Sequence, residues 1–252
     1  MKILLDGKDL INLAEHSKPV PLEEFHQTLE SKGHQIVLSY TNVRELAAPI
    51  AITEEVLKVR RLLNAVESLP AIYIREGFII DDEIRAAATA FEAGAEYSPI
   101  NPFVRRWDYT FHHGESPARL YINYGLFEIV HSISRRHHAL ERQMTQRGIR
   151  IPSAGIKAFA RWVRENPARC PGYRQSYEMY HAIQANSSDI PKDGDIPDMA
   201  HIAALPYVDF LTLDRRMMNY ATHIGSKLLK NISSPPYQTR LFRSLAEMSP
   251  TL

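Results

Sequence analysis

The stretch that decides the fold class is the first one, residues 1–13, which reads MKILLDGKDLINL. Residues 3–5 are apolar without alternation, which is typical of a strand covered on both faces, and Gly7 allows the chain to turn after it. Asp6 then stands at the carboxyl end of a buried strand, where open α/β sheets collect ligands and catalytic groups. A simpler interpretation is that Asp6 only caps a helix that begins near Asp9.

Later segments repeat this pattern of a short apolar run beside a helix. Apolar runs at residues 35–40, 71–74 and 208–213 predict further buried strands. Helical periodicity separates them, as in residues 53–68 before the third run. The alternation predicts an α/β domain with a parallel sheet flanked by helices.

The middle of the chain departs from the α/β pattern. Residues 95–116 predict a long aromatic loop, and residues 117–147 predict a long helix that ends before a glycine. We therefore predict that residues 1–94 and 191–240 form one α/β domain. Residues 95–190 are expected to form a large, mostly helical and arginine-rich insertion.

Composition sets the class of protein. The chain has 252 residues, of which 23% are charged and 44% hydrophobic, which is ordinary for a globular protein. No stretch approaches the roughly 20 apolar residues of a membrane span, and the first residues do not resemble a signal peptide, so no membrane partner is expected. The single cysteine, Cys170, cannot form an internal disulfide. A cytoplasmic location is therefore expected, with Cys170 as a packed residue.

Basic residues are unevenly distributed. Residues 90–190 carry 13 basic and 9 acidic residues, whereas residues 1–89 carry 10 basic and 14 acidic ones. The basic residues of the middle block are almost all arginines, whose guanidinium groups suit phosphate oxygens and base stacking. Nucleic acid is therefore the expected partner, although solvated helix faces explain the same excess. The candidate contacts are Arg135, Arg136, Arg147 and Arg150.

Four carboxylates take comparable places in the predicted domain. Asp6 and Asp214 each follow a predicted strand, Glu45 lies early in the helix after the second strand, and Asp198 lies at a helix start. A fold that makes the strands neighbours would gather these acids in one cleft, where their charges repel one another. A divalent cation removes this repulsion, and oxygen ligands without sulfur favour Mg²⁺ or Mn²⁺. Such ions promote attack of water on phosphodiesters.

These four acidic segments resemble the successive motifs of PIN-domain nucleases. They read LLD at 4–6, LSYTNVREL at 38–46, DMAHIA at 198–203 and DFLTLD at 209–214. Residues 220–225 resemble the family's last helix and turn, and residues 227–232 its closing edge strand. The resemblance covers about residues 1–75 and 195–235.

The resemblance implies a metal-dependent nuclease, with RNA as a substrate in preference to DNA. It gives the catalytic and metal-binding roles to the four carboxylates, Asp6, Glu45, Asp198 and Asp214. Thr212 would be the hydroxyl that supports the last of them. His201 and Asp209 are expected beside the site because they are close to these acids in sequence. A protein inhibitor or a second copy of the chain is a further partner consistent with this class.

The first motif departs from the family's pattern. PIN nucleases usually follow the first aspartate with a hydroxyl residue and an asparagine, whereas this chain has Gly7 and Lys8. Lys8 is suited to contacting substrate phosphate, but an ammonium near the metal position would also weaken metal occupancy. Two alternatives therefore remain. One is a PIN-like protein that binds nucleic acid or acts as a scaffold without cleaving. The other is a phosphatase of the haloacid-dehalogenase type, which would use Asp6 as nucleophile but needs a second aspartate at position 8.

Overall fold

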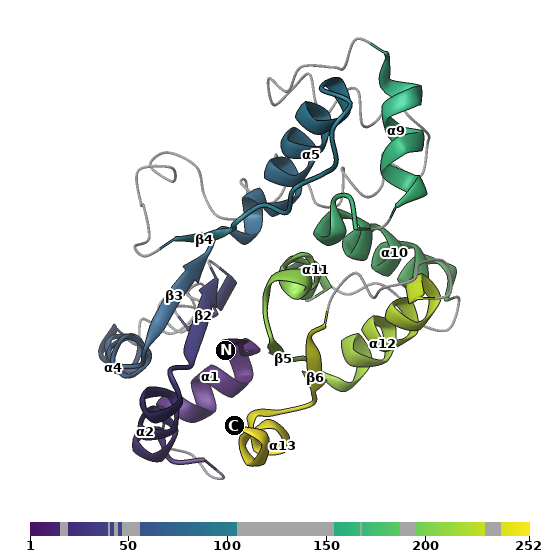
Figure 1. The fold of residues 1–252 in the computed structure, drawn as a ribbon. Helices are drawn as coiled ribbons and strands as arrows, with labels where there is room; N and C mark the ends of the chain where they lie inside the picture. The colour runs from purple at the N-terminus through teal and green to yellow at the C-terminus, as the bar shows by residue number, and fades with distance from the viewer. Residues whose placement is uncertain are drawn as a thin grey trace.

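The structure is a computed structural model, and it describes residues 1–15, 20–39, 41–42, 45–46, 56–104, 154–166, 168–186, 195–229 and 238–252. Within these ranges six strands form one sheet in the order β4, β3, β2, β1, β5, β6 (Figure 1). All neighbouring pairs are parallel except β3 with β4. The α/β class predicted from the sequence is confirmed. The strands are β1 Lys2–Leu4, β2 Gln35–Ser39, β3 Ala71–Ile74, β4 Phe103–Val104, β5 Phe210–Thr212 and β6 Arg240–Phe242.

The first strand lies in the middle of the sheet, and its register decides which residues become neighbours. Leu4 pairs with Val37 of β2 and with Leu211 of β5. Because these strands are parallel, β1, β2 and β5 all end at one edge of the sheet, which we call the carboxyl edge. The segments that leave this edge begin with Asp6 after β1 and with Asp214 after β5.

Helices cover one face of the sheet around Ile3 and Leu5. These two side chains share a buried cluster with Leu10, Phe25 and Met248, which lie on three of the covering helices. Alternation along the strand sends Ile3 and Leu5 to this face and Leu4 to the other. The helices here are α1 Gly7–Ala14, α2 Leu22–Lys32, α4 Val56–Glu67 and α13 Leu245–Met248, which is followed by the 3₁₀ turn η3 Ser249–Thr251.

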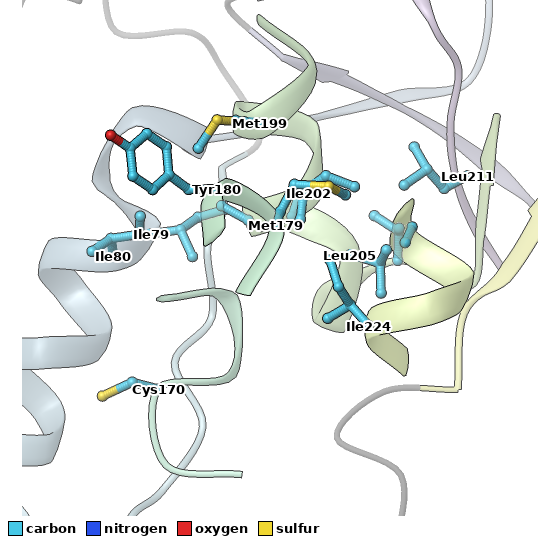
Figure 2. Close-up of a cluster of buried hydrophobic side chains, with 14 of the residues drawn as sticks. Ile79, Ile80, Cys170, Met179, Tyr180, Met199, Ile202, Leu205, Leu211 and Ile224 are labelled. Atoms are coloured by element: carbon cyan, nitrogen blue, oxygen red, sulfur yellow. The ribbon is translucent and has the colours of Figure 1, made fainter. Parts of the chain in front are cut away.

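The opposite face carries the larger cluster, which includes Leu4. Figure 2 shows part of it, with Met179 of α10 beside Ile202 of α11. The helices that supply it are α5 Glu76–Glu92, α9 Ile156–Glu165, α10 Pro171–Ala185, α11 Asp195–Ala204 and α12 Arg215–Leu229, with the 3₁₀ turn η2 Leu205–Tyr207 after α11. No helix of the described part is both long and apolar enough to cross a membrane.

Two parts of the predicted insertion join this architecture. Within residues 95–116, expected as a loop, β4 pairs with the edge strand β3. Helices α9 and α10 contribute Phe159 and Met179 to the same cluster as Leu4. The long helix predicted over residues 117–147 lies outside the described residues.

The closing edge strand predicted at residues 227–232 is wrong for residues 227–229, because α12 continues to Leu229, and residues 230–232 lie outside the described residues. Met217, Ala221, Ile224 and Leu228 are all buried, and their spacing of three or four residues is that of a helix face. The edge strand is instead β6, which pairs with β5. The first helix also differs from prediction, since α1 begins at Gly7 rather than near Asp9.

Candidate active site at the carboxyl edge

Asp6 leaves β1 and caps the helix that follows. Its Oδ1 accepts a hydrogen bond of 3.2 Å from the backbone N–H of Lys8, which satisfies one of the donors at the start of α1. Its own backbone N–H donates to Oγ1 of Thr212 in β5, at 2.8 Å. Asp6 is therefore both a helix cap and a carboxylate of the carboxyl edge, so the two interpretations from the sequence are compatible.

Thr212 connects the ends of β1 and β5. The resemblance gives its hydroxyl to Asp214, but the structure has it accept from Asp6 and donate to the carboxylate of Asp9. Asp9 also accepts from the backbone of Leu245. Burial raises the pKa of Asp9, and the neighbouring charge of Asp6 adds to this, whereas the two hydrogen bonds lower it. Asp9 thus joins the site through Thr212 instead of capping α1.

Gly7 allows Glu45 to approach the start of α1. A Cβ atom added to Gly7 would lie 1.7 Å from Oε2 and 2.7 Å from Cδ of Glu45. Such an overlap means that only glycine leaves room for the carboxylate in this position. The Gly7 that departs from the family's pattern therefore has a physical role here, because it leaves room for the Glu45 carboxylate against the first residue of α1.

A buried polar network supports the end of β2. The Oδ1 atom of Asn42 accepts from the N–H and the hydroxyl of Ser39, at 3.1 and 3.0 Å, and its Nδ2 donates to the carbonyl of Leu5, at 2.9 Å. The Ser39 hydroxyl also lies 3.4 Å from Nε2 of His201 in α11. This network ties β1, β2 and α11 together below the carboxyl edge. His201 was named from the sequence, whereas Ser39 and Asn42 were not singled out there.

Asp198 and Asp214, the other two predicted ligands, lie on α11 and directly before α12. Asp198 is half-buried on α11, three residues before His201 and hence on the same side of that helix. Asp214 is exposed, and its Oδ1 accepts from the N–H of Met217 at 2.7 Å, so it caps α12 as Asp6 caps α1. Asp6 and Asp214 thus follow adjacent parallel strands at one edge, as predicted.

One predicted neighbour of the site, Asp209, lies elsewhere. Asp209 precedes β5, and its Oδ2 accepts from the N–H of Lys2 at 2.6 Å, so it belongs to the opposite end of the strand. Residues five apart in a strand are separated by about 16 Å, and closeness in sequence therefore misplaced it. Lys8 is exposed on α1. The arginines proposed as nucleic-acid contacts, Arg135, Arg136, Arg147 and Arg150, lie outside the described residues.

The acids at the carboxyl edge offer carboxylate oxygens, the ligands that a hard divalent cation prefers. Asp6 and Asp214 each use one carboxylate oxygen for a helix cap. Among the described residues, however, no group of three or more histidine, cysteine, aspartate or glutamate side chains is placed to hold one ion. The edge gathers suitable ligands without arranging them as a closed metal site.

A second ionisable group lies inside the larger core cluster. Glu83 of α5 is fully buried, and its carboxylate accepts from the N–H groups of Gly172 and Tyr173, at 2.7 and 2.8 Å, and from the hydroxyl of Tyr207. Burial raises the pKa of Glu83 to about 7, although these hydrogen bonds lower it. Nothing in the local sequence marked Glu83, because its partners lie 89 residues or more away.

No family model, curated protein or solved structure matches the chain. The assignment of function therefore depends on the geometry of the carboxyl edge.

Proposed function

We propose that the chain is a metal-dependent nuclease that hydrolyses phosphodiester bonds, with RNA as the expected substrate and a PIN-like sheet in which residues 95–190 are an insertion. The observation that supports this proposal is the meeting of acids at one edge. Asp6 follows β1, Glu45 packs against Gly7, and Asp214 follows the adjacent parallel strand. Mg²⁺ or Mn²⁺ would be the cofactor, because these ions prefer carboxylate oxygens.

The chain's own residues would position the ligands. The cap to Lys8 and the bond to Thr212 fix the backbone and one oxygen of Asp6. Asp6, Glu45, Asp198 and Asp214 would hold the ion, which requires their side chains to turn toward one another. The chemistry that a bound Mg²⁺ or Mn²⁺ ion supplies is activation of water and neutralisation of the charge that develops on the phosphate.

The experiment is a cleavage assay with labelled single-stranded and structured RNA and DNA, with Mg²⁺, with Mn²⁺ and with a chelator. Asp6→Asn and Asp214→Asn should each abolish cleavage, and the double variant should be no worse than either single one, because removal of one ligand disables a shared centre. Asp209→Asn is the matched control, since it changes the same chemical group at the other end of β5. Cleavage by Asp6→Asn at the rate of the unchanged protein would end the proposal.

Metal binding can be tested without activity. An ion that binds only the folded protein stabilises it by mass action, by about 2.7 kcal/mol when its concentration is 100 times the dissociation constant. Mn²⁺ should therefore raise the melting temperature, and the rise should shrink in Asp6→Asn and Asp214→Asn but not in Asp209→Asn. An equal rise in all four proteins would place the ion elsewhere.

A second candidate function is nucleic-acid binding without cleavage. It is favoured by the use of Asp6 and Asp214 as helix caps, together with the lack of a three-ligand group in the described part of the chain. This candidate predicts RNA binding that is the same with Mn²⁺ and with a chelator, and intact RNA after long incubation. Metal-dependent product formation that requires Asp6 would exclude it.

A further inference from the structure

A groove runs between α10 and α12. The two helices lie side by side (Figure 1), and the space between their outer faces has a volume of about 1000 Å³. Helix α12 contributes Arg215, Arg216, Asn219, Tyr220, His223 and Lys227 to its lining. None of these residues belongs to the acidic motifs of the carboxyl edge.

The groove follows from the amphipathic patterns of both helices. The face of α12 that carries Met217, Ile224 and Leu228 is buried in the core. Met179 and Ile183 of α10 are buried in the same cluster. The outer faces of the two helices therefore meet above the core, and their side chains line the groove.

Basic side chains outnumber acidic ones among the described residues that line the groove. Among the described residues that line it, Glu178 is the sole acid. Its carboxylate already holds Arg174 at 3.0 Å and Lys227 at 2.8 Å. Arg215 and Arg216 add two further basic side chains to the lining, and guanidinium groups favour an anionic ligand.

An aromatic surface lies beside these charges. The guanidinium of Arg216 lies 5.8 Å from the ring centre of Tyr220. The Tyr220 hydroxyl in turn accepts from Nδ2 of Asn186 at 3.0 Å, so the ring is held between α10 and α12. A fixed ring next to a guanidinium can stack on a base while the guanidinium contacts a phosphate. Proteins that bind single-stranded nucleic acids use this combination.

The groove adjoins the carboxyl edge. Arg215 follows Asp214 directly. The Met217 N–H, which donates to the Asp214 carboxylate, belongs to the first turn of α12. A strand lying along α12 would therefore reach the acids at the start of that helix.

We propose that the groove between α10 and α12 binds the backbone of single-stranded nucleic acid and directs it toward Asp6 and Asp214. The second half of this inference rests on the proposed nuclease function, whereas the binding itself does not. Arg215 and Arg216 contact phosphates, and Tyr220 stacks on a base. An acidic peptide would use the same charges but would gain less from the ring.

Binding is measured by fluorescence anisotropy of a labelled single-stranded RNA over a range of salt concentrations, with a chelator present so that no cleavage intervenes. Neutralising two phosphate contacts in Arg215→Gln/Arg216→Gln should reduce the slope of log affinity against log salt by about 1.4. Arg161→Gln/Arg164→Gln is the matched control, because it removes two exposed arginines, three residues apart, from α9. The control should keep the slope and the affinity of the unchanged protein.

A second variant separates stacking from charge. Tyr220→Leu should weaken RNA binding by about fivefold or more while leaving the salt slope unchanged. Melting temperatures equal to that of the unchanged protein show that each variant is folded. Equal losses in the groove and control pairs would overturn the inference. So would a labelled polyglutamate peptide that binds as tightly as RNA and depends on the same two arginines.

The outcomes distinguish this inference from the proposed function. Weakened RNA binding in the arginine pair, together with unchanged cleavage in Asp6→Asn, would retain the groove and reject the nuclease. Suppose instead that cleavage requires Asp6 and Asp214, while Arg215→Gln/Arg216→Gln binds and cleaves RNA as the unchanged protein does. That result would retain the nuclease and reject the groove.

Discussion

The buried carboxyl of Glu83 should make the stability of the protein depend on pH. Its pKa is raised from 4.5 to about 7 in the folded protein. A raised carboxyl pKa means that the folded state holds the proton more tightly than the unfolded state does. The stability that protonated Glu83 contributes is therefore complete below about pH 4.5, and it is lost as the pH rises to about 7. At 1.36 kcal/mol for each unit, ionisation of Glu83 should cost the fold about 3 kcal/mol.

Glu83→Gln tests this magnitude because glutamine cannot ionise. The amide retains one oxygen acceptor, but its NH₂ group must face one of the donors from Gly172, Tyr173 or Tyr207. At low pH the variant should therefore be less stable than the unchanged protein, by about 1 to 3 kcal/mol. At high pH the unchanged protein pays for a buried charge that the variant lacks. The free energy of unfolding of the variant, relative to that of the unchanged protein, should therefore rise by about 2 to 3 kcal/mol between about pH 5 and about pH 8.

Urea unfolding followed by circular dichroism at several pH values measures this difference. Other titrating groups are common to both proteins and cancel when the free energies of unfolding are subtracted. Glu30→Gln is the matched control, because Glu30 lies on the surface of α2 with a side chain that is 63% exposed. Its pH profile should run parallel to that of the unchanged protein. A parallel profile for Glu83→Gln as well would refute the assignment of a raised pKa to Glu83.

Three further predictions concern close packing. Gly7→Ala should displace the Glu45 carboxylate and abolish metal-dependent cleavage, while urea unfolding shows unchanged stability or a gain of up to about 1 kcal/mol, because the flexible side chain can move and alanine favours the helix. Gly172→Ala should instead destabilise the fold by about 1 to 3 kcal/mol in the same assay, since its Cβ would lie 2.4 Å from the backbone oxygen of Ala203, and equal stability would contradict the packing of α10 on α11. Cys170 is fully buried, and burial raises the pKa of its thiol, so an aromatic disulfide reagent should react with it only as fast as the protein unfolds.

The sequence was informative where a local pattern decides the structure. Apolar runs predicted β1, β2, β3 and β5, and the positions of these strands agree with prediction to within two residues. Because buried strands of an α/β domain are parallel, the same patterns placed Asp6 and Asp214 at one edge. Strand β4 has two residues, which is too short for a periodic signal, and β6 contains only two consecutive apolar residues, Leu241 and Phe242, after an arginine.

The sequence was uninformative where a contact joins distant segments. No spacing indicates that Glu45 needs the space beside Gly7, since the two residues meet only after β1 and β2 have paired. Glu83 and Gly172 are likewise brought together by the packing of α5 on α10. The wrong expectation for residues 227–229 had a different origin, because the resemblance to an edge strand outweighed the helical spacing of Ile224 and Leu228.

The two caps at the carboxyl edge are the strongest link between fold and chemistry. Asp6 and Asp214 each begin a helix directly after a parallel strand, so the N-termini of α1 and α12 open on the same edge. The dipole of each helix places partial positive charge there, and each cap removes only one N–H group from those that an anion can use. A phosphate approaching between the helices would meet favourable potential from α1 and α12 and the positive charge of Arg215, which follows the second cap. The same edge holds the carboxylates that a hard cation prefers, and the pairing of cation ligands with an anion-attracting environment is what hydrolysis of a phosphodiester requires.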